Sequence, residues 1–96
     1  MSEHEEIIIK REDSHGPADE TFKLTATFNA DIMKALGPTR VQEPHVVSLF
    51  NIMQKIARII CGQYHPDHWD DIIGYALLGK KQHEKSAMEK FGEIPD

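Results

Sequence analysis

One segment of this chain, residues 44–61, is apolar around most of the circumference that it would have as a helix. Its apolar residues are Val46, Val47, Leu49, Phe50, Ile52, Met53, Ile56, Ala57, Ile59 and Ile60. A helix that is apolar on nearly every side is stable only when other elements cover several of its faces. The segment therefore predicts an all-α domain in which this helix is buried on several sides.

A first helix is predicted over residues 18–36. Asp19 is a suitable N-cap, and the apolar residues that follow recur at helical spacing. Residues 24–28 also alternate as a strand would, but the helical spacing continues past them, so we prefer a helix. Gly37 and Pro38 then end the helix, with Gly37 as the C-cap.

The second and third helices are predicted over residues 44–61 and 67–91. Pro44 suits the first position of a helix, and Asp67 can cap the third helix. Gly74 removes a side chain in mid-helix at a cost of about 1 kcal/mol relative to alanine, which indicates close approach of a neighbouring helix or of a ligand. The core face of the third helix is expected to hold Trp69, Ile72, Ile73, Ala76, Leu77 and Leu78.

The predicted organisation is an N-terminal arm (1–16), one helical domain (17–92) and a short tail (93–96). The arm carries three consecutive isoleucines, residues 7–9, which favour an extended conformation. A chain of 96 residues buries only about 60–65% of the surface that it exposes when unfolded. We therefore expect the three-helix domain to complete its core by forming a homo-oligomer.

The charge and cysteine content limit the partners and the cellular compartment that we expect for this chain. The net charge is −5 and the isoelectric point is near 5.6, which argues against binding bulk duplex DNA or an anionic membrane surface. Cys61 is the single cysteine and lies in an apolar run, so we interpret it as a core residue of a protein in a reducing compartment. With no bilayer-spanning apolar run and no signal pattern, we expect a cytoplasmic protein, in the host cytoplasm if it is phage-encoded.

The few polar residues of the apolar segment share one helical stripe. Ser48, Asn51, Lys55 and Arg58 are spaced by three, four and three residues. Residues 45–65 contain no acidic residue. Because burying an unpaired cation is costly, Lys55 and Arg58 must meet carboxylates, phosphates or water.

The third helix begins with acidic residues that could meet this stripe. One interpretation is an interhelical salt bridge from Asp71 to Lys55 or Arg58, and such structural ion pairs are commoner than functional sites. The other is a pocket in which Lys55 and Arg58 grip a phosphate. The aspartates at 67, 70 and 71 would then orient the cations, hold Mg²⁺, or accept hydrogen bonds from a base or ribose.

Other polar residues extend the candidate ligand-binding set. Asn51 and Tyr75 lie near the charged cluster in the predicted helices, and His15, beside a glycine, could close over a ligand. His65 and His68 flank Asp67, but no zinc-site spacing such as Cys-x-x-Cys or His-Glu-x-x-His accompanies them. We therefore do not predict a zinc site.

The order of these motifs resembles a group of small, largely uncharacterised phage and prophage proteins. The resemblance covers about residues 11–80 and depends on His15-Gly16, Phe28, Lys55-Ile56-Ala57-Arg58 and Asp67-x-Trp69-x-Asp71-Ile72-x-Gly74-Tyr75-Ala76. The helical pattern of that group is in turn similar to the all-α nucleotide pyrophosphohydrolases of the MazG and dimeric dUTPase type. This second resemblance implies a nucleotide as the ligand.

The chain departs from the MazG-like pattern at the metal site. Those enzymes hold Mg²⁺ with a Glu-x-x-Glu pair on one helix and a Glu-x-x-Asp pair on the next. Asp67 with Asp70 or Asp71 could stand for the later pair, but the earlier pair is missing because Lys55 and Arg58 occupy the second helix. The resemblance therefore supports nucleotide recognition better than hydrolysis.

The function expected from the sequence is non-enzymatic binding of a phosphorylated or cyclic nucleotide through Lys55 and Arg58, with no required cofactor. Such a protein would sequester a nucleotide signal or modulate nucleotide metabolism. One alternative is a MazG-like pyrophosphohydrolase with a reduced site, in which Asp67, Asp70 and Asp71 hold Mg²⁺. Another is a protein-interaction module that inhibits a host protein through the arm.

Overall fold

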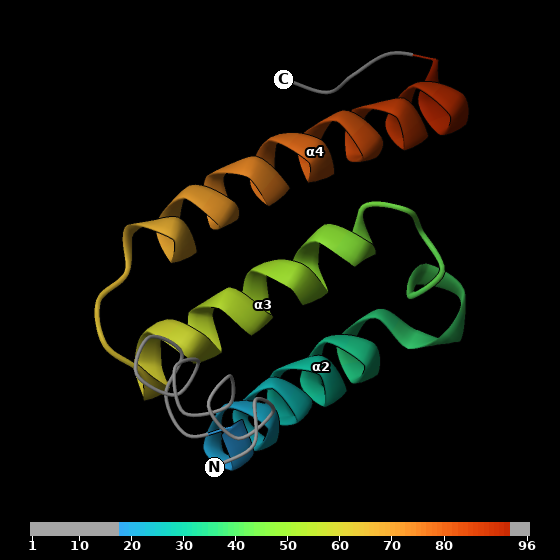
Figure 1. Cartoon of the computed structure of the whole chain (residues 1–96). Coiled ribbons are helices and arrows are strands. Elements are labelled where there is room, and N and C mark those ends of the chain that lie inside the picture. The colour runs from blue at the N-terminus through green and yellow to red at the C-terminus, as the bar shows by residue number, and fades with distance from the viewer. Residues whose placement is uncertain (1–17, 93–96) are drawn as a thin grey trace, which may run out of the picture.

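The computed structural model describes residues 18–92, in which the chain forms three helices (Figure 1). They are α2 (Ala18–Arg40), α3 (Val46–Cys61) and α4 (Pro66–Phe91). The described range contains no strand, so the prediction of an all-α, three-helix domain is confirmed. No helix in the described range has both the length and the mean hydropathy needed to cross a bilayer. The predicted N-terminal arm and C-terminal tail lie outside the described residues.

The predicted break after the first helix is confirmed, but helical turns continue beyond it. Gly37 has φ 76° and ψ 176°, a conformation that favours glycine. Pro38 follows and cannot donate a backbone hydrogen bond. One more turn then runs to Arg40, so α2 extends past the predicted end at residue 36 with a kink at Gly37.

The start of α3 differs from the prediction, whereas its end agrees. The helix begins at Val46, two residues after Pro44, and His45 occupies the N-cap position without a capping side-chain hydrogen bond. Val46 N–H donates to the carbonyl of Glu43 three residues back, at 3.0 Å, so Pro44 lies in a tight turn ahead of the helix. Gly62 ends the helix as predicted.

The prediction that Asp67 caps α4 is wrong. The helix begins at Pro66, and His65 is the N-cap: its Nδ1 accepts a hydrogen bond from Asp67 N–H at 3.2 Å. Proline suits the first helical position because no intrahelical partner exists there for an N–H group. Asp67 therefore lies in the first turn, where its negative charge interacts favourably with the positive end of the helix dipole.

The helix α3 lies between the other two, and the three form a single layer (Figure 1). Both α2 and α4 pack against α3, and they do not pack against each other. Val46 and Ala57 are the only fully buried apolar residues of the described range. Val47 and Ile60 of α3 are 64% and 62% exposed. The predicted burial of α3 is thus achieved only on the sides that face α2 and α4.

The face of α4 that packs on α3 is not the one predicted. Four of the expected core residues are 54–59% exposed, namely Trp69, Ile73, Leu77 and Leu78. A fifth, Ala76, is exposed as well, and only Ile72 is half-buried. The inward face instead carries His68, which is 1% exposed, and Gly79. A Cβ at Gly79 would lie 2.8 Å from Ser48 Cβ, so close backbone approach determines which face of α4 is inward.

The two glycines in the interior of α4 are predicted to respond oppositely to alanine. The close approach of a neighbouring helix, one of the two alternatives expected at Gly74, is wrong, because a Cβ there would meet no other helix within 4 Å. Gly74→Ala should therefore raise the free energy of unfolding by about 1 kcal/mol through helix propensity. At Gly79 the clash with Ser48 should cost about 1–3 kcal/mol and offset that gain.

Urea unfolding followed by circular dichroism measures both variants. Gly74→Ala serves as the control for the propensity change, since both substitutions add one methyl group to the same helix. Equal stabilisation by the two variants would contradict the close crossing of α3 and α4.

Candidate functional site

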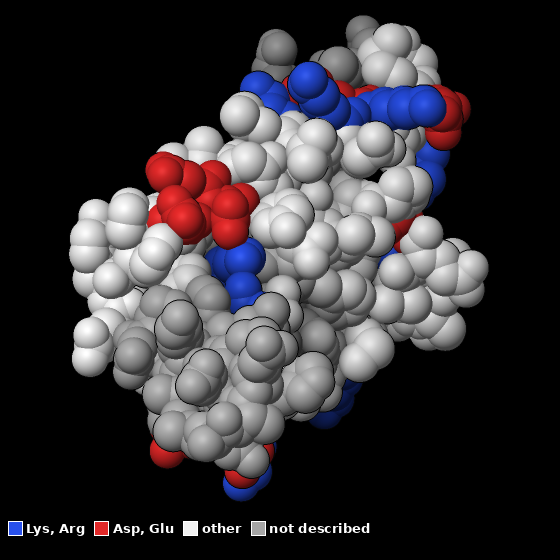
Figure 2. Space-filling model, viewed as in Figure 1, with Lys and Arg blue, Asp and Glu red and all other residues white. Residues whose placement is uncertain are grey.

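The structure brings Lys55 of α3 against Asp71 of α4. Lys55 Nζ lies 2.9 Å from Asp71 Oδ2, with the lysine side chain 12% exposed and the aspartate side chain 45% exposed. Figure 2 shows the acidic side chains at the start of α4 directly beside a basic group. The interhelical ion pair considered in the sequence analysis is therefore present, and it uses Lys55.

The ionisation of Asp71 reflects the cations around it. The hydrogen bond from Lys55 lowers the pKa of Asp71 below its ordinary value of 3.8, and partial desolvation opposes this shift. The charges of Lys55, His68 and Arg58 also act to lower this pKa. Asp71 is thus an ionised carboxylate at neutral pH, with more than one cationic group around it.

Within residues 18–92, Arg58 is the cation of this cluster that has no ion-pair partner. It lies three residues after Lys55 on α3 and is half-buried. No hydrogen bond or ion pair joins its side chain to another residue of the described range 18–92. Asn51, also half-buried, lies one turn before Lys55 on the same stripe. A half-buried guanidinium without a carboxylate partner is suited to an external anion.

The other predicted residues are not drawn into this cluster. Asp70 is exposed, and the 72% exposed side chain of Asp67 has its nearest ionic contact with His65, at 3.7 Å. Within residues 18–92, no group of three or more His, Cys, Asp or Glu side chains is placed to hold a metal ion. The magnesium alternative thus gains no support from the described residues. His15 lies outside them.

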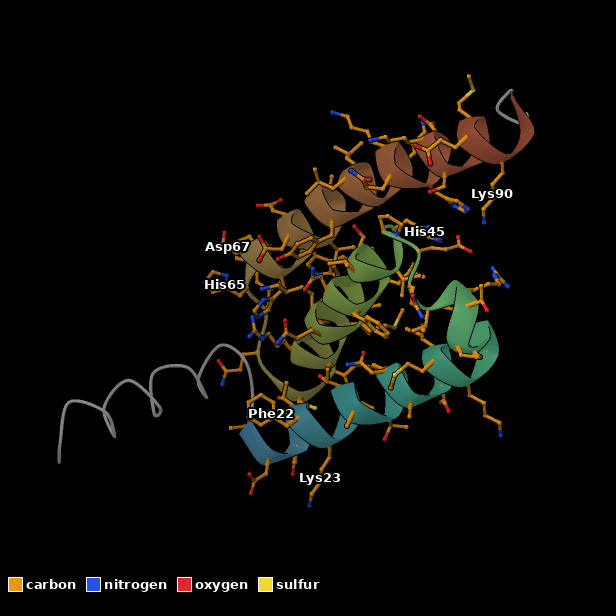
Figure 3. The ribbon with its side chains drawn as sticks, turned by 90° about the vertical axis from the view of Figure 1, so that its right-hand side faces the viewer. Phe22, Lys23, His45, His65, Asp67 and Lys90 are labelled. Carbon is orange, nitrogen blue, oxygen red and sulfur yellow. The ribbon has the colours of Figure 1, made fainter. Side chains whose placement is uncertain are left out.

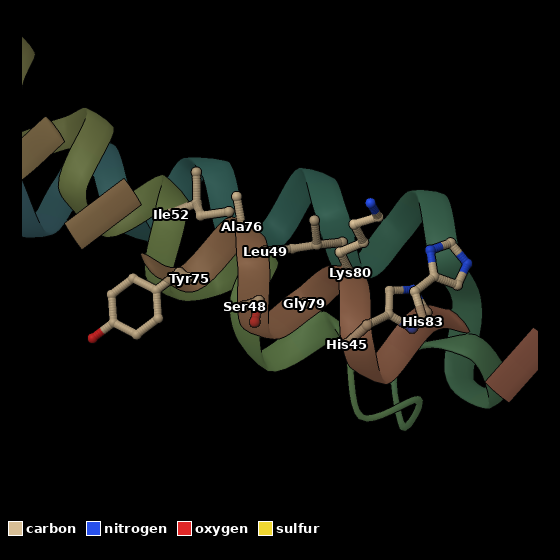
Figure 4. Close-up of a pocket in the computed structure, with 9 residues that line it drawn as sticks. All are labelled: His45, Ser48, Leu49, Ile52, Tyr75, Ala76, Gly79, Lys80 and His83. Atoms are coloured by element: carbon tan, nitrogen blue, oxygen red, sulfur yellow. The ribbon is translucent and has the colours of Figure 1, made fainter. Parts of the chain in front are cut away.

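A cavity of about 350 Å³ lies between α3 and α4, one helical turn from the ion pair (Figure 4). Ile52 and Tyr75 line it, and they stand three residues before Lys55 and four residues after Asp71, respectively. Leu49 and Ser48 continue its α3 wall. Its volume is within the range of small-molecule sites.

Two stacked histidines close the end of the cavity away from Tyr75 (Figure 4). The rings of His45 and His83 have centroids 4.0 Å apart and planes inclined by 7°. His45 is 7% exposed, and its Nδ1 has no hydrogen-bond partner within the described part of the chain. Burial lowers the pKa of His45, and the charge of His83 lowers it further.

The sequence pattern does not single out this histidine pair. His45, the N-cap of α3, is three residues before Ser48, and Gly79 and His83 are four apart on α4, so each pair lies on one side of its helix. Nothing in either pattern shows that the two faces meet. The close approach at Gly79, which brings them together, is a property of the folded chain.

A second ionic network lies beyond the histidines. Glu43 Oε1 is 4.0 Å from Arg40 Nε and 3.5 Å from Lys90 Nζ. Figure 3 shows His45 and Lys90 at the end of the molecule opposite His65 and Asp67. Both cations thus contact the one carboxylate of Glu43, and they are separate from the Lys55 cluster.

Comparison with known proteins places both features inside one family match. The family described as "Domain of unknown function (DUF6378)" matches residues 1–83, which include the Lys55–Asp71 pair and the cavity. No curated protein and no solved structure matches the chain. Because the description names no activity, functional inference depends on the geometry of the site.

The ion pair predicts a pH-dependent contribution of Asp71 to stability. A carboxylate whose pKa is lowered by folding stabilises the protein above its ordinary pKa of 3.8, and this contribution is lost as the pH falls through the lowered value. Asp71→Asn should therefore unfold more easily than the native sequence at pH 7, and the difference should fade as the pH falls below 3.8 and through the lowered pKa.

Urea titrations at several pH values measure this effect. Asp70→Asn is the matched control, since it removes an exposed charge one position away. A destabilisation by Asp71→Asn that is constant with pH, or an equal effect of Asp70→Asn, would contradict the assignment.

Proposed function

The chain belongs to the DUF6378 family of domains of unknown function, and we propose that it acts as a non-enzymatic nucleotide-binding protein. The observation that carries the proposal is the Lys55–Asp71 pair, which lies about one helical turn from the cavity between α3 and α4, with Arg58 a further turn along α3. Cationic groups near a cavity of this size suit a ligand in which a phosphate is joined to a ring.

In this proposal Arg58 is the main contact for the phosphate. The ammonium of Lys55 is already held by Asp71 at 2.9 Å, so its charge is largely balanced. Arg58 has no such partner among the described residues. Its planar guanidinium can donate two parallel hydrogen bonds to phosphate oxygens. Lys55 would add charge to the site, and Asp71 would keep that lysine in place.

The cavity would receive the base or the ribose. Leu49 and Ile52 offer apolar contacts, and Tyr75 offers an aromatic ring with a hydroxyl group. Aromatic side chains stack on planar rings, and the hydroxyl can bond to a polar edge. A nucleotide should therefore bind more tightly than its phosphate group alone.

A protein of this kind would sequester a nucleotide signal or modulate nucleotide metabolism. The remote resemblance to MazG-like enzymes supports recognition better than hydrolysis, because Lys55 and Arg58 occupy the second helix, where those enzymes carry their first acidic pair. We therefore favour binding over the MazG-like pyrophosphohydrolase reaction.

The proposal predicts that the Arg58 side chain contributes strongly to nucleotide affinity. Arg58→Ala should weaken binding by about tenfold or more, since a hydrogen bond to a charged group contributes about 1.5–3 kcal/mol. Arg58→Lys should fall between this variant and the native chain, because it keeps the charge and loses the bidentate geometry. Isothermal titration calorimetry with inorganic phosphate, ribose 5-phosphate, nucleoside monophosphates and cyclic nucleotides provides the measurement.

Lys23→Ala is the control, because Lys23 is an exposed cation on α2, away from the site (Figure 3). An equal loss in this variant would show that only net charge matters. No binding of any nucleotide at millimolar concentration, or unchanged binding in Arg58→Ala, would sink the proposal. Equal affinities for phosphate and nucleotides would show that the cavity takes no part.

A further inference from the structure

The outward side of α4 carries an apolar stripe that no other described element covers. Trp69, Ile73 and Leu77 are spaced by four residues, so they lie one above another on the helix surface. Their exposed fractions are 54%, 59% and 59%. We call these three residues the outer stripe. Large apolar side chains exposed side by side are a mark of an interaction surface.

The described fold needs more burial than its own helices provide. Within residues 18–92, only Val46 and Ala57 are fully buried apolar residues. A single layer leaves both of its broad faces open, and each large apolar side chain that is fully buried contributes about 1.5–3 kcal/mol. Covering the outer stripe would therefore add appreciably to a small core.

The charges along α4 identify the partner. Asp70 lies beside the N-terminal end of the outer stripe, and Lys80 and Lys81 lie at its C-terminal end, all of them exposed. On the face shown in Figure 2, uncharged surface separates the acidic start of α4 from the basic side chains that follow. Such a helix is complementary to a second copy of itself in the opposite direction.

We infer that a second copy of this chain docks on the outer stripe, with the two α4 helices antiparallel about a two-fold axis near residue 75. In this register Ile73 faces Leu77 of the other copy, and Asp70 faces its Lys80. A two-fold axis makes each of these contacts twice. Within one copy, Lys80 Nζ lies 3.8 Å from Glu84 Oε1, and the Lys80 side chain is 72% exposed. Such a surface ion pair is weak, so Lys80 can pair with Asp70 of the other copy instead.

Sedimentation velocity of the full chain without nucleotide tests the inference. The native chain should sediment at twice the 11.0 kDa monomer mass or a higher multiple. Leu77→Glu should give monomers, because it buries an unpaired carboxylate at the interface. Leu78→Glu is the matched control: Leu78 is 57% exposed on the same helix, but it lies about 100° around from Leu77.

Charge reversal tests the antiparallel register. Asp70→Lys and Lys80→Asp should each weaken association by about tenfold, since each places like charges opposite one another twice per dimer. The variant with both changes restores the opposite-charge pairing and should recover the native association. Circular dichroism confirms that each variant is folded.

A native chain that stays monomeric at about 100 μM overturns the inference, as does dissociation by Leu78→Glu as complete as that by Leu77→Glu. Failure of the double reversal to recover association overturns the antiparallel register. These measurements contain no nucleotide, so their failure is distinct from failure of the ligand proposal.

Discussion

The structure depends on the desolvation of one helix. The sequence of α3 is apolar around most of its circumference, and only two neighbouring helices are available in the described range to cover it. They lie on opposite sides, which produces a single layer instead of a closed bundle. Any charged group on α3 is thereby placed close to a helix interface, where it needs a partner.

The charge on α3 then determines what the site can do. The helix has two cations and no carboxylate of its own, so any neutralising carboxylate comes from another element. Asp71 supplies one carboxylate, and its hydrogen bond with Lys55 accounts for the lowered pKa of that aspartate. One positive charge, that of Arg58, is left without a partner in the described range. Anion binding is the chemistry that this imbalance favours.

The sequence predicted the helices well because their signals are local. Apolar periodicity located all three, and Gly62 marked an end correctly, whereas Gly37, predicted as the C-cap of the first helix, lies at a kink within α2. The capping error at Asp67 arose because Pro66 moved the start of α4 back by one residue. Lys55 and Asp71 were predictable as partners because a cation on an apolar helix has few choices.

Which face of α4 turns inward was not predictable in the same way. Apolarity favoured Trp69, Ile73 and Leu77, whereas the fold turns His68 and Gly79 towards α3. This chain has more apolar surface than its own helices can cover. Apolarity alone therefore does not indicate which face of α4 packs against α3. The stacked pair of His45 and His83 was missed for a related reason, because it exists only after that choice is made.

The two proposals meet at Lys80. Its side chain lines the cavity between α3 and α4, and in the antiparallel register it faces Asp70 of the second copy. An anionic group bound at that end of the cavity would compete with this aspartate for the same ammonium group. The two binding equilibria are then linked. A ligand that draws Lys80 inward lowers the affinity of the two copies for each other, and dimer formation lowers the affinity for that ligand by the same factor. A ligand held only at Arg58 leaves Lys80 to the interface, so the presence or absence of this coupling reports how far along the groove the ligand extends.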